Sequence, residues 1–311
     1  MAHHVVVLSF HGRVDTVRCV DSLMADGSRA DRLRVLVIDN GSYDGALAEV
    51  RAAHPAVDVL QLPVNLGFAG GMNVGIRRAL AAGADTVTVL NNDTVAPAGT
   101  MSRLARTASD GSVVSPEVRY LDAPDTVWFG GGTVDAATGL ARHLRPAELS
   151  APDPDGVRAT TILAGCCITA PASTWRRVGL FDERYFLNFE DSDWSLRAGA
   201  LGVPLVVDTR ARLLHAVSAS FTGPSRYLGS YYYTRNGLLF GRERCGAGPG
   251  TAYRFVRRHV LPGVRAAARE QGVREGARAA TVVAWSLADR ARGRFGAAPA
   301  PLRSMARRWA A

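Results

Sequence analysis

Short apolar runs alternate with amphipathic stretches through the first third of the chain. Four runs, 5–8, 35–38, 57–60 and 86–90, are predicted to be buried strands. Helices are expected between them, over 14–24, 45–53 and 72–82. This order favours an α/β fold in which a mostly parallel, Rossmann-like sheet is flanked by helices on both faces. Ligands of such sheets bind at the carboxyl ends of the strands.

Polar residues follow three of the predicted strands directly. Ser9 ends the first run, Asp39 to Ser42 end the second, and Asn91 to Thr94 follow the fourth. Taken singly, each is ordinary turn or helix-cap chemistry. Because parallel strands end at one edge of a sheet, their repetition indicates a binding site at that edge.

The segment from Asn65 to Gly75 is rich in glycine. Glycine lets backbone approach a ligand closely, and a loop over 67–71 before a helix at Met72 would direct N–H groups at a phosphate. A tight loop that needs positive φ is the other explanation. The dinucleotide fingerprint G-x-G-x-x-G is absent and this loop follows the third strand, which disfavours a dehydrogenase.

An acidic cluster opens a helix predicted over 190–200. Glu190, Asp191 and Asp193 lie within four residues, beside apolar residues such as Phe186. Acids at a helix start complement the helix dipole. They also suit a general base, because apolar neighbours raise the pKa of a carboxylate.

Two further residues have the chemistry of metal ligands. Asp93 follows an apolar strand, and a carboxylate there is a hard oxygen ligand for Mg²⁺ or Mn²⁺. His215 ends an apolar stretch about 25 residues after the acidic cluster, and neutral imidazole is a common metal ligand. A turn or helix cap at Asp93 and a structural histidine are the simpler explanations.

The rest of the chain is less regular. Residues 110–160 are predicted as short strands and loops, followed by a strand over 161–170, a short helix over 173–178 and a strand over 203–207. From 225 onward the chain is expected to be mostly helical. Within that region, the run from Tyr231 to Asn236 either borders a substrate site or forms a packed aromatic cluster.

Positive charge is concentrated at the C-terminus. The chain has no lysine, and its net charge of +9 arises from a surplus of 11 positive charges after residue 241, so the part before it is slightly acidic. Basic amphipathic helices over 253–270 and 276–292 would suit an anionic membrane surface; a solvated extension is the alternative. Without a nucleic-acid motif or interleaved aromatic residues, nucleic acid is excluded as a partner.

The compartment is expected to be the cytoplasm. The chain has no apolar run long enough to span a membrane, and its first eight residues lack the pattern of a signal peptide. The cysteines form no C-x-x-C pair, which argues against a zinc site or disulfide framework and for small buried hydrophobes. They are Cys19, Cys166, Cys167 and Cys245.

Taken together, the motifs resemble the family 2 glycosyltransferases with the GT-A fold, particularly the bacterial rhamnosyltransferase-like branch. The resemblance covers about residues 4–240, and the matching segments follow the family's order. They are 5–9, 37–45, 65–75, 90–94, 179–186, 190–197 and His215. It implies a catalytic domain over 1–240, divided into a nucleotide-sugar half (1–110) and an acceptor and catalytic half (111–240), followed by a basic helical extension (241–311).

The resemblance also implies an inverting hexosyltransferase and a role for each site residue. Asp191 matches the catalytic base, with Glu190 in support, and Asp93 and His215 would hold Mg²⁺ or Mn²⁺. Asn91 and Asn92 stand where acids often occur, so one carboxylate remains in that motif. The implied donor-binding residues are Ser9, Asp39, Asn65, Gly70, Asn73, Asn92 and Asp93.

The implied donor is a dTDP- or UDP-linked sugar, with rhamnose suggested by the branch. The acceptor is a lipid-linked cell-wall intermediate, a polysaccharide or a small natural product, and peripheral membrane contact through the basic extension would suit the first. Two other functions remain as alternatives. One is a nucleotidyltransferase that makes nucleotide sugars, although the segment from Ser9 to Arg13 is a poor triphosphate loop; the other is an inactive nucleotide-sugar binding protein.

Overall fold

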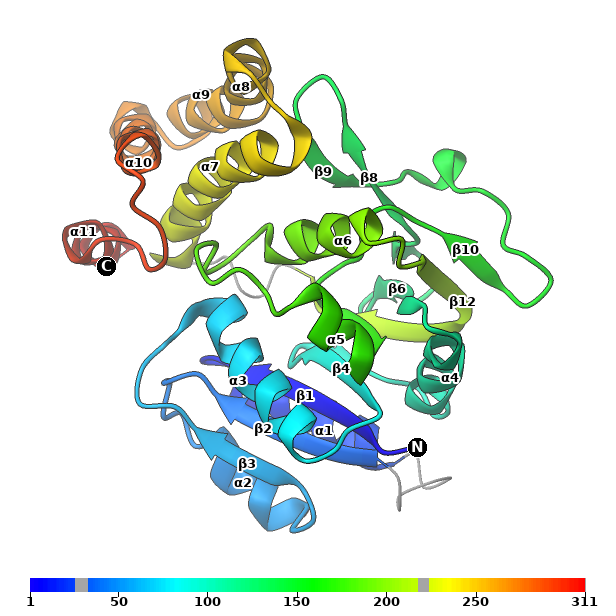
Figure 1. Ribbon diagram of the computed structural model, residues 1–311. Helices are drawn as coiled ribbons and strands as arrows, with labels where there is room; N and C mark the ends of the chain where they lie inside the picture. The colour runs from blue at the N-terminus through cyan, green and yellow to red at the C-terminus, as the bar shows by residue number, and fades with distance from the viewer. Residues whose placement is uncertain (26–32, 218–223, 311) are drawn as a thin grey trace.

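The computed structural model describes residues 1–25, 33–217 and 224–310. Within them, ten strands form one sheet, and a separate hairpin stands beside it (Figure 1). The sheet strands are β1 (His3–Ser9), β2 (Leu33–Asp39), β3 (Asp58–Gln61), β4 (Thr86–Asn91), β5 (Thr94–Val95), β6 (Val113–Tyr120), β7 (Val127–Phe129), β10 (Val157–Ala159), β11 (Cys167–Pro171) and β12 (Leu205–His215). The hairpin strands are β8 (Gly132–Asp135) and β9 (Leu140–His143).

Helices cover the sheet and form the C-terminal region. The helices of the sheet region are α1 (Arg13–Met24), α2 (Ala46–Ala53), α3 (Gly67–Ala81), α4 (Thr100–Thr107), α5 (Ala172–Val178) and α6 (Glu190–Ala200). The later helices are α7 (Pro224–Cys245), α8 (Pro249–Phe255), the π-helix η4 (Val256–Val260), α9 (Leu261–Glu270), α10 (Val273–Ala291) and α11 (Ala300–Ala310). Among the described residues, no helix combines the length and apolar character needed to cross a membrane.

The sheet is mixed and mainly parallel, as predicted. Its strand order is β10-β12-β6-β11-β4-β1-β2-β3, with β5 paired to β12 and β7 to β6. β1 runs parallel to β2 and β4, β2 to β3, and β12 to β6, whereas β11 is antiparallel to its neighbours β4 and β6. The carboxyl ends of β1, β2, β4, β6 and β12 therefore meet at one edge.

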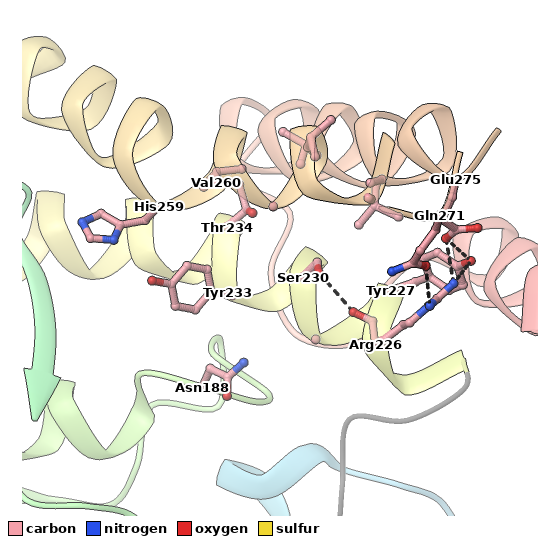
Figure 2. Close-up of a pocket in the computed structure, with 17 residues that line it drawn as sticks. Asn188, Arg226, Tyr227, Ser230, Tyr233, Thr234, His259, Val260, Gln271 and Glu275 are labelled. Atoms are coloured by element: carbon pink, nitrogen blue, oxygen red, sulfur yellow. Dashed lines mark hydrogen bonds and ion pairs between the residues drawn. The ribbon is translucent and has the colours of Figure 1, made fainter. Parts of the chain in front are cut away.

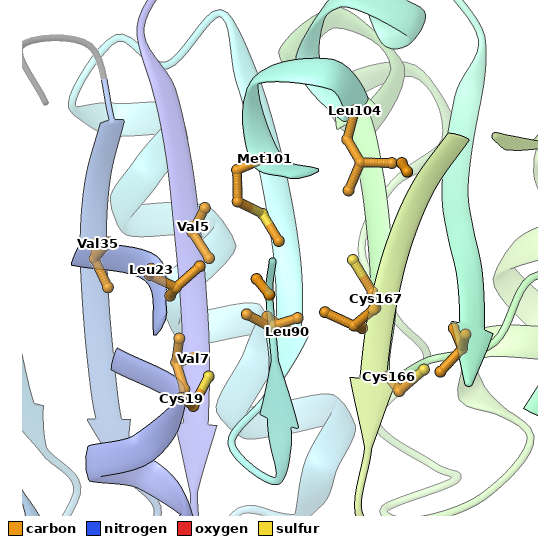
Figure 3. Close-up of a cluster of buried hydrophobic side chains, with 14 of the residues drawn as sticks. Val5, Val7, Cys19, Leu23, Val35, Leu90, Met101, Leu104, Cys166 and Cys167 are labelled. Carbon is orange, nitrogen blue, oxygen red and sulfur yellow. The ribbon is translucent and has the colours of Figure 1, made fainter. Parts of the chain in front are cut away.

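Strand alternation divides the core into two layers, one on each face of the sheet. Val5 and Val7 of β1 point into a cluster with α1, α2 and α4, part of which Figure 3 shows. Val6 and Leu8 point the other way, into a cluster with α3, α5 and α6. Cys19, Cys166 and Cys167 belong to the first cluster, as expected of cysteines that act as small hydrophobes.

The predicted loop over 67–71 is wrong, because α3 begins at Gly67 and continues to Ala81. Its glycines serve close packing on the sheet. A Cβ at Gly75 would lie 2.2 Å from Val6 Cγ1, and one at Gly71 would lie 2.7 Å from Leu8 Cδ1. Glycine-rich sequence here reflects contact between helix and strand, and the expected phosphate loop is not formed.

Two strand boundaries also differ from the prediction. The strand predicted over 161–170 begins only at Cys167, and the one predicted over 203–207 continues to His215. The extension of β12 arises from partners far along the chain: beyond a register shift after Asp208 it pairs again with β6, and its last two residues pair with β5. Such pairing leaves no local signal in the sequence.

The C-terminal region is helical, as predicted, and packs on the catalytic part of the chain. The boundary we predicted between 240 and 241 falls inside α7. Tyr231 donates a hydrogen bond to Asp289 of α10 (2.8 Å), and Gly296 N–H donates to the Arg184 carbonyl (2.9 Å). In Figure 1, α10 and α11 lie beside α7.

Candidate functional site

The predicted polar clusters meet at the carboxyl edge of the sheet. Ser9 stands opposite Asp39 in the β1–β2 pair, and Leu8 stands opposite Asn91 in the β1–β4 pair. The chain between β4 and β5 carries Asn92 and Asp93 at this edge. The parallel register therefore brings together segments that lie far apart in the sequence.

Asp93 and His215 are in contact although 122 residues separate them. His215 pairs with Thr94 in the β12–β5 ladder, and Ala216 N–H donates to the Asp93 carbonyl (2.9 Å). His215 Nε2 lies 3.1 Å from Asp93 Oδ1, and both residues are buried. Since a carboxylate accepts, Nε2 donates. Nδ1 is buried and has no hydrogen-bond partner among the described residues.

This pair has the donor set of a divalent cation that is completed by substrate. The described residues contain no group of three or more His, Cys, Asp or Glu side chains that could hold a metal ion. Mg²⁺ and Mn²⁺ are commonly held by one or two protein ligands, with phosphate oxygens and water supplying the rest. Asp93 Oδ1 and His215 Nε2 face each other, so the pair could hold such a cation between them in place of their hydrogen bond; a closed protein cage does not fit.

Asp191 lies in the first turn of α6 and is held from two sides. Gly165 N–H donates to its Oδ2 (2.8 Å), and Ser192 N–H donates to its Oδ1 (2.6 Å). Burial raises the pKa of Asp191 above its ordinary value, although these hydrogen bonds act in the opposite direction. The side chain is half-buried, so it is accessible from the site.

A two-residue bridge connects Asp191 to the end of β4. Asn91 N–H donates to the Cys166 carbonyl (2.9 Å), and the preceding residue, Gly165, holds Asp191. A Cβ at Gly165 would lie 3.1 Å from Asp191 Oδ2, so glycine permits this approach. The acidic cluster and the Asn91 to Thr94 cluster therefore belong to one site.

Glu190 is buried beside Asp191 and differs from it in character. Its Oε2 has no hydrogen-bond partner among the described residues. Burial, together with the nearby charge of Asp191, raises the pKa of Glu190 well above its ordinary value. Asp191, which is half-buried and whose carboxylate accepts hydrogen bonds from Gly165 and Ser192, is therefore the better candidate for a base.

Asp39 organises the loop that follows β2. Ser42 donates to Oδ1 through its N–H (2.9 Å) and its hydroxyl, and Tyr43 N–H donates to Oδ2 (2.8 Å). Burial would raise the pKa of Asp39, but these hydrogen bonds hold it below its ordinary value. The ionised carboxylate fixes the backbone of Tyr43, a residue that has positive φ and is 64% exposed.

Other predicted donor residues are held by protein contacts. Both amide hydrogens of Asn73 are donated, to the Phe181 carbonyl and to Glu183 (both 2.9 Å). Asn65 accepts from Asn40 and from Gly67 N–H and is half-buried, which leaves its own amide N–H groups available. Asn73 therefore tethers segment 181–183, whereas among the described residues Asn65 accepts hydrogen bonds only through its side-chain oxygen.

Ser9, Asn92 and Gly70 also have structural contacts. The Ser9 hydroxyl lies 2.7 Å from the Thr16 hydroxyl, which in turn accepts from the Asn92 amide (2.9 Å). This network connects the end of β1, the start of α1 and the β4–β5 turn. Gly70 lies inside α3, and a Cβ there would meet Leu66 Cβ at 2.9 Å.

Aromatic side chains at this edge escaped our sequence reasoning. Phe10 is 45% exposed after β1, its ring 4.4 Å from the His11 ring, and His11 has positive φ. Like Tyr43, these rings stand where the strands end. A cavity of about 330 Å³ opens beside them, lined by His11, Gly12, Arg13, Val14, Asp15 and Asp44. The signal in the sequence was aromatic residues placed directly after strands.

Trp128 and His143 were also missed. The Trp128 ring makes edge contacts with His215 (centroids 4.8 Å apart) and with His143 (4.6 Å). β7 and β9 bring these residues to the site from the irregular region 110–160. Because that region lacks periodicity, nothing local in the sequence marked them.

The run from Tyr231 to Asn236 forms a packed cluster that supports the site. Arg235 is completely buried and donates to the carbonyls of Arg184 and Tyr185, and Asn236 also donates to the Tyr185 carbonyl (2.6 Å). The turn they hold precedes α6 and contains three non-glycine residues with positive φ, a strained arrangement. These are Phe186, Asn188 and Phe189.

A second cavity, of about 470 Å³, lies between α7 and the helices η4, α9 and α10 (Figure 2). Arg226 and Glu275 form an ion pair at one end of it (2.7 Å), and apolar side chains such as Val260 line its wall. Asn188 also lines this cavity, whereas none of the predicted site residues does. The catalytic candidates therefore lie at the sheet edge.

Comparison with known proteins identifies the family. The model of glycosyl transferase family 2 matches residues 5–150. Galactofuranosyltransferase GlfT1 of Mycobacterium tuberculosis is 30% identical over 217 residues, which cover 67% of this chain and 68% of that protein. This chain belongs to glycosyl transferase family 2. It is a glycosyltransferase, and the predicted family and enzyme class are confirmed.

Other similar proteins support this assignment. The N-acetylglucosaminyl-diphospho-decaprenol L-rhamnosyltransferase of M. tuberculosis is 29% identical over 229 residues (64% of this chain, 71% of that protein). The mannosyltransferase PcManGT from Pyrobaculum calidifontis, solved with GDP-Man and Mn²⁺, superposes with a TM-score of 0.58 at 17% identity (98% of this chain, 82% of that one). GalNAc-T7, solved with UDP, GalNAc and Mn²⁺, gives 0.59 at 15% identity (85% of this chain, 57% of that one). These structures establish the GT-A fold.

Proposed function

We propose that this chain transfers a sugar from a nucleoside-diphosphate sugar to an acceptor hydroxyl, with inversion at the anomeric carbon. The observation that carries the proposal is the juxtaposition of the Asp93–His215 pair and Asp191 through Gly165 and Cys166. It supports the proposal because these side chains, which have the chemistry of a base and of metal ligands, lie at the edge of the sheet where such folds bind ligands. Relatives that transfer rhamnose and galactofuranose support the reaction class.

The donor occupies the carboxyl ends of β1, β2 and β4. The loop fixed by Asp39 and the amide of Asn65 contact the nucleoside, and the exposed rings of Phe10 and Tyr43 provide a surface on which the base stacks. Asp93 and His215 would hold Mg²⁺ or Mn²⁺ at this edge, and the cation would supply positive charge to balance the leaving diphosphate.

Asp191 acts as the general base. Its carboxylate, fixed by Gly165 and Ser192, accepts the proton of the acceptor hydroxyl as the oxygen attacks the anomeric carbon. The raised pKa makes this carboxylate a stronger base than an exposed aspartate. Glu190, which is buried beside Asp191, supports the start of α6. One base and a departing diphosphate give a single displacement, which inverts the configuration.

The two halves of the catalytic region divide these tasks. Residues 1–110 carry the nucleotide-sugar contacts, whereas 111–240 carry Asp191, His215 and the acceptor side. The acceptor class that we propose is a saccharide attached to a prenyl diphosphate, in line with the decaprenol-linked substrate named for the rhamnosyltransferase relative. The sugar we propose is rhamnose, donated by dTDP-rhamnose.

The basic extension suits a lipid-linked acceptor. Exposed arginines on η4 and α9 give this part of the surface a positive charge. They are Arg257, Arg258, Arg265 and Arg269. We propose that they contact the anionic surface of the cell membrane from the cytoplasmic side.

Thermal unfolding with dTDP or UDP tests the donor site. At 100 times its dissociation constant, a nucleoside diphosphate should stabilise the wild type by about 2.7 kcal/mol in the presence of Mn²⁺ or Mg²⁺. The cation-dependent part should disappear in Asp93→Ala, because the carboxylate ligand is lost. Asp58→Ala is the matched control, since Asp58 is exposed at the amino end of β3, the far edge of the sheet. An absence of stabilisation by either nucleotide would overturn the proposed function.

A further inference from the structure

His143 is the last residue of the β8–β9 hairpin. Part of the residue is open to solvent, but its ring packs edge-on against Trp128 and Phe129, with centroids 4.6 and 5.0 Å apart. Trp128 contacts His215 in the same manner. His143 of the hairpin and Trp128 and Phe129 of β7 thus form a wall of rings beside the Asp93–His215 pair.

The protonation of His143 is set by its neighbour. Nδ1 lies 3.2 Å from the Trp128 carbonyl oxygen, and because a carbonyl can only accept, Nδ1 carries the hydrogen. In the neutral ring, Nε2 then has the lone pair. Among the described residues no side chain or backbone group donates to it. His143 Nε2 is therefore a hydrogen-bond acceptor that has no donor among the described residues.

His143 also lies within electrostatic range of the base. Burial among the surrounding protein lowers the pKa of His143, His215 acts in the same direction, and Asp191 acts against both. Reciprocally, His143 acts to lower the pKa of Asp191. The lowered pKa keeps the ring neutral at physiological pH. Trp128 contacts both His143 and His215, so one ring separates His143 from the Asp93–His215 pair. His143 and Asp191 are therefore two hydrogen-bond acceptors that belong to the same site.

We propose that His143 and Trp128 form the acceptor-binding wall of this enzyme, in which His143 Nε2 accepts a hydrogen bond from a second hydroxyl of the acceptor saccharide. This inference rests on the proposed function. A sugar ring offers neighbouring hydroxyls, so one can donate to His143 while Asp191 deprotonates the other. Trp128, half-buried, offers an apolar surface to the C–H groups of the sugar. Such an arrangement orients the acceptor and favours a saccharide over water.

Kinetics of His143→Ala test this role. The probe is N-acetylglucosamine linked through diphosphate to a short prenyl chain, and the readout is nucleoside diphosphate released from dTDP-rhamnose with and without it. Loss of one oriented hydrogen bond should raise the KM of the probe about tenfold. The donor KM and the slow hydrolysis of donor by water should not change, because neither involves the acceptor wall. His143→Gln, whose side-chain oxygen reaches toward the place of Nε2, should restore most of the affinity.

His54→Ala is the matched histidine control. His54 caps the C-terminus of α2, at the amino edge of the sheet, and should leave all constants unchanged. An unchanged probe KM in His143→Ala, or a donor KM that rises equally, would overturn the acceptor role. The acceptor role would also be overturned if the probe failed to increase nucleoside diphosphate release by the wild type although the donor is bound and hydrolysed. Failure of the wild type to bind donor would instead contradict the proposed function, so the two failures are distinguishable.

Discussion

Replacement of Asp191 by asparagine is expected to lower the kcat for sugar transfer about a thousandfold. Asparagine has nearly the same shape, but its single amide oxygen can accept from Gly165 or from Ser192 and not from both, and it cannot take the proton of the acceptor hydroxyl. Nucleoside-diphosphate affinity should not change, since Asp191 lies on the acceptor side. Initial rates and a nucleotide-binding titration on the same preparation measure the two quantities separately.

The pH profile supplies a second readout for the same base. Burial places the pKa of Asp191 above the ordinary aspartate value of 3.8, so the carboxylate is lost as pH falls through the raised pKa. The wild-type rate should therefore fall on the acid side at a higher pH than an exposed aspartate would give, and Asp191→Asn should lack this limb. Asp58→Asn, far from the site, should behave as the wild type. Retention of most activity in Asp191→Asn would rule out this base.

Arg235→Ala is expected to lower the free energy of unfolding by about 3 kcal/mol. The guanidinium is buried against the rings of Tyr231, Tyr232 and Phe295, at 5.0, 5.2 and 5.7 Å from their centroids. Its removal leaves a cavity and deprives the carbonyls of Arg184 and Tyr185 of a donor. Urea unfolding followed by circular dichroism measures the loss.

Arg242→Ala is the matched control for Arg235→Ala because it removes an exposed arginine from the same helix, α7. Its effect should stay within about 0.5 kcal/mol. Arg235→Lys keeps the charge but loses the planar fork that reaches several acceptors at once, so it should fall between the wild type and Arg235→Ala. Equal stability of the two alanine variants would show that the buried cluster does not support the fold.

Local patterns in the sequence were sufficient for the architecture of the first half. The continuous apolar run in β1 identified a strand whose two faces are both buried, and the polar residues that follow β1, β2 and β4 marked the edge at which those strands end. The acidic residues at the start of α6 were also identified. Their place beside the cluster that follows β4 depends on the Gly165–Cys166 bridge, which no spacing in the sequence reveals. Only the order of the family motifs indicated that the two clusters belong to one site.

The errors have physical causes. Glycines such as Gly75 permit helix-to-sheet contact and were mistaken for a ligand loop, because both functions require the absence of a side chain. Asn73 and Asn92 have the chemistry of ligand-binding residues, but their amide groups donate hydrogen bonds to distant parts of the chain. Asn73 bonds to segment 181–183, and Asn92 bonds to α1. Trp128 and His143 escaped notice because irregular strands carry no periodic signal. Contacts between distant segments decide each of these cases.

The configuration of the transferred sugar tests the proposed mechanism most directly. Proton NMR of the product formed from dTDP-rhamnose and the prenyl-diphosphate-linked N-acetylglucosamine reports the geometry at the anomeric carbon. A single displacement with Asp191 as base predicts that the configuration is inverted relative to the donor. Retention of the donor's configuration would require two displacements or a different reaction path, and would contradict the role that we assign to Asp191.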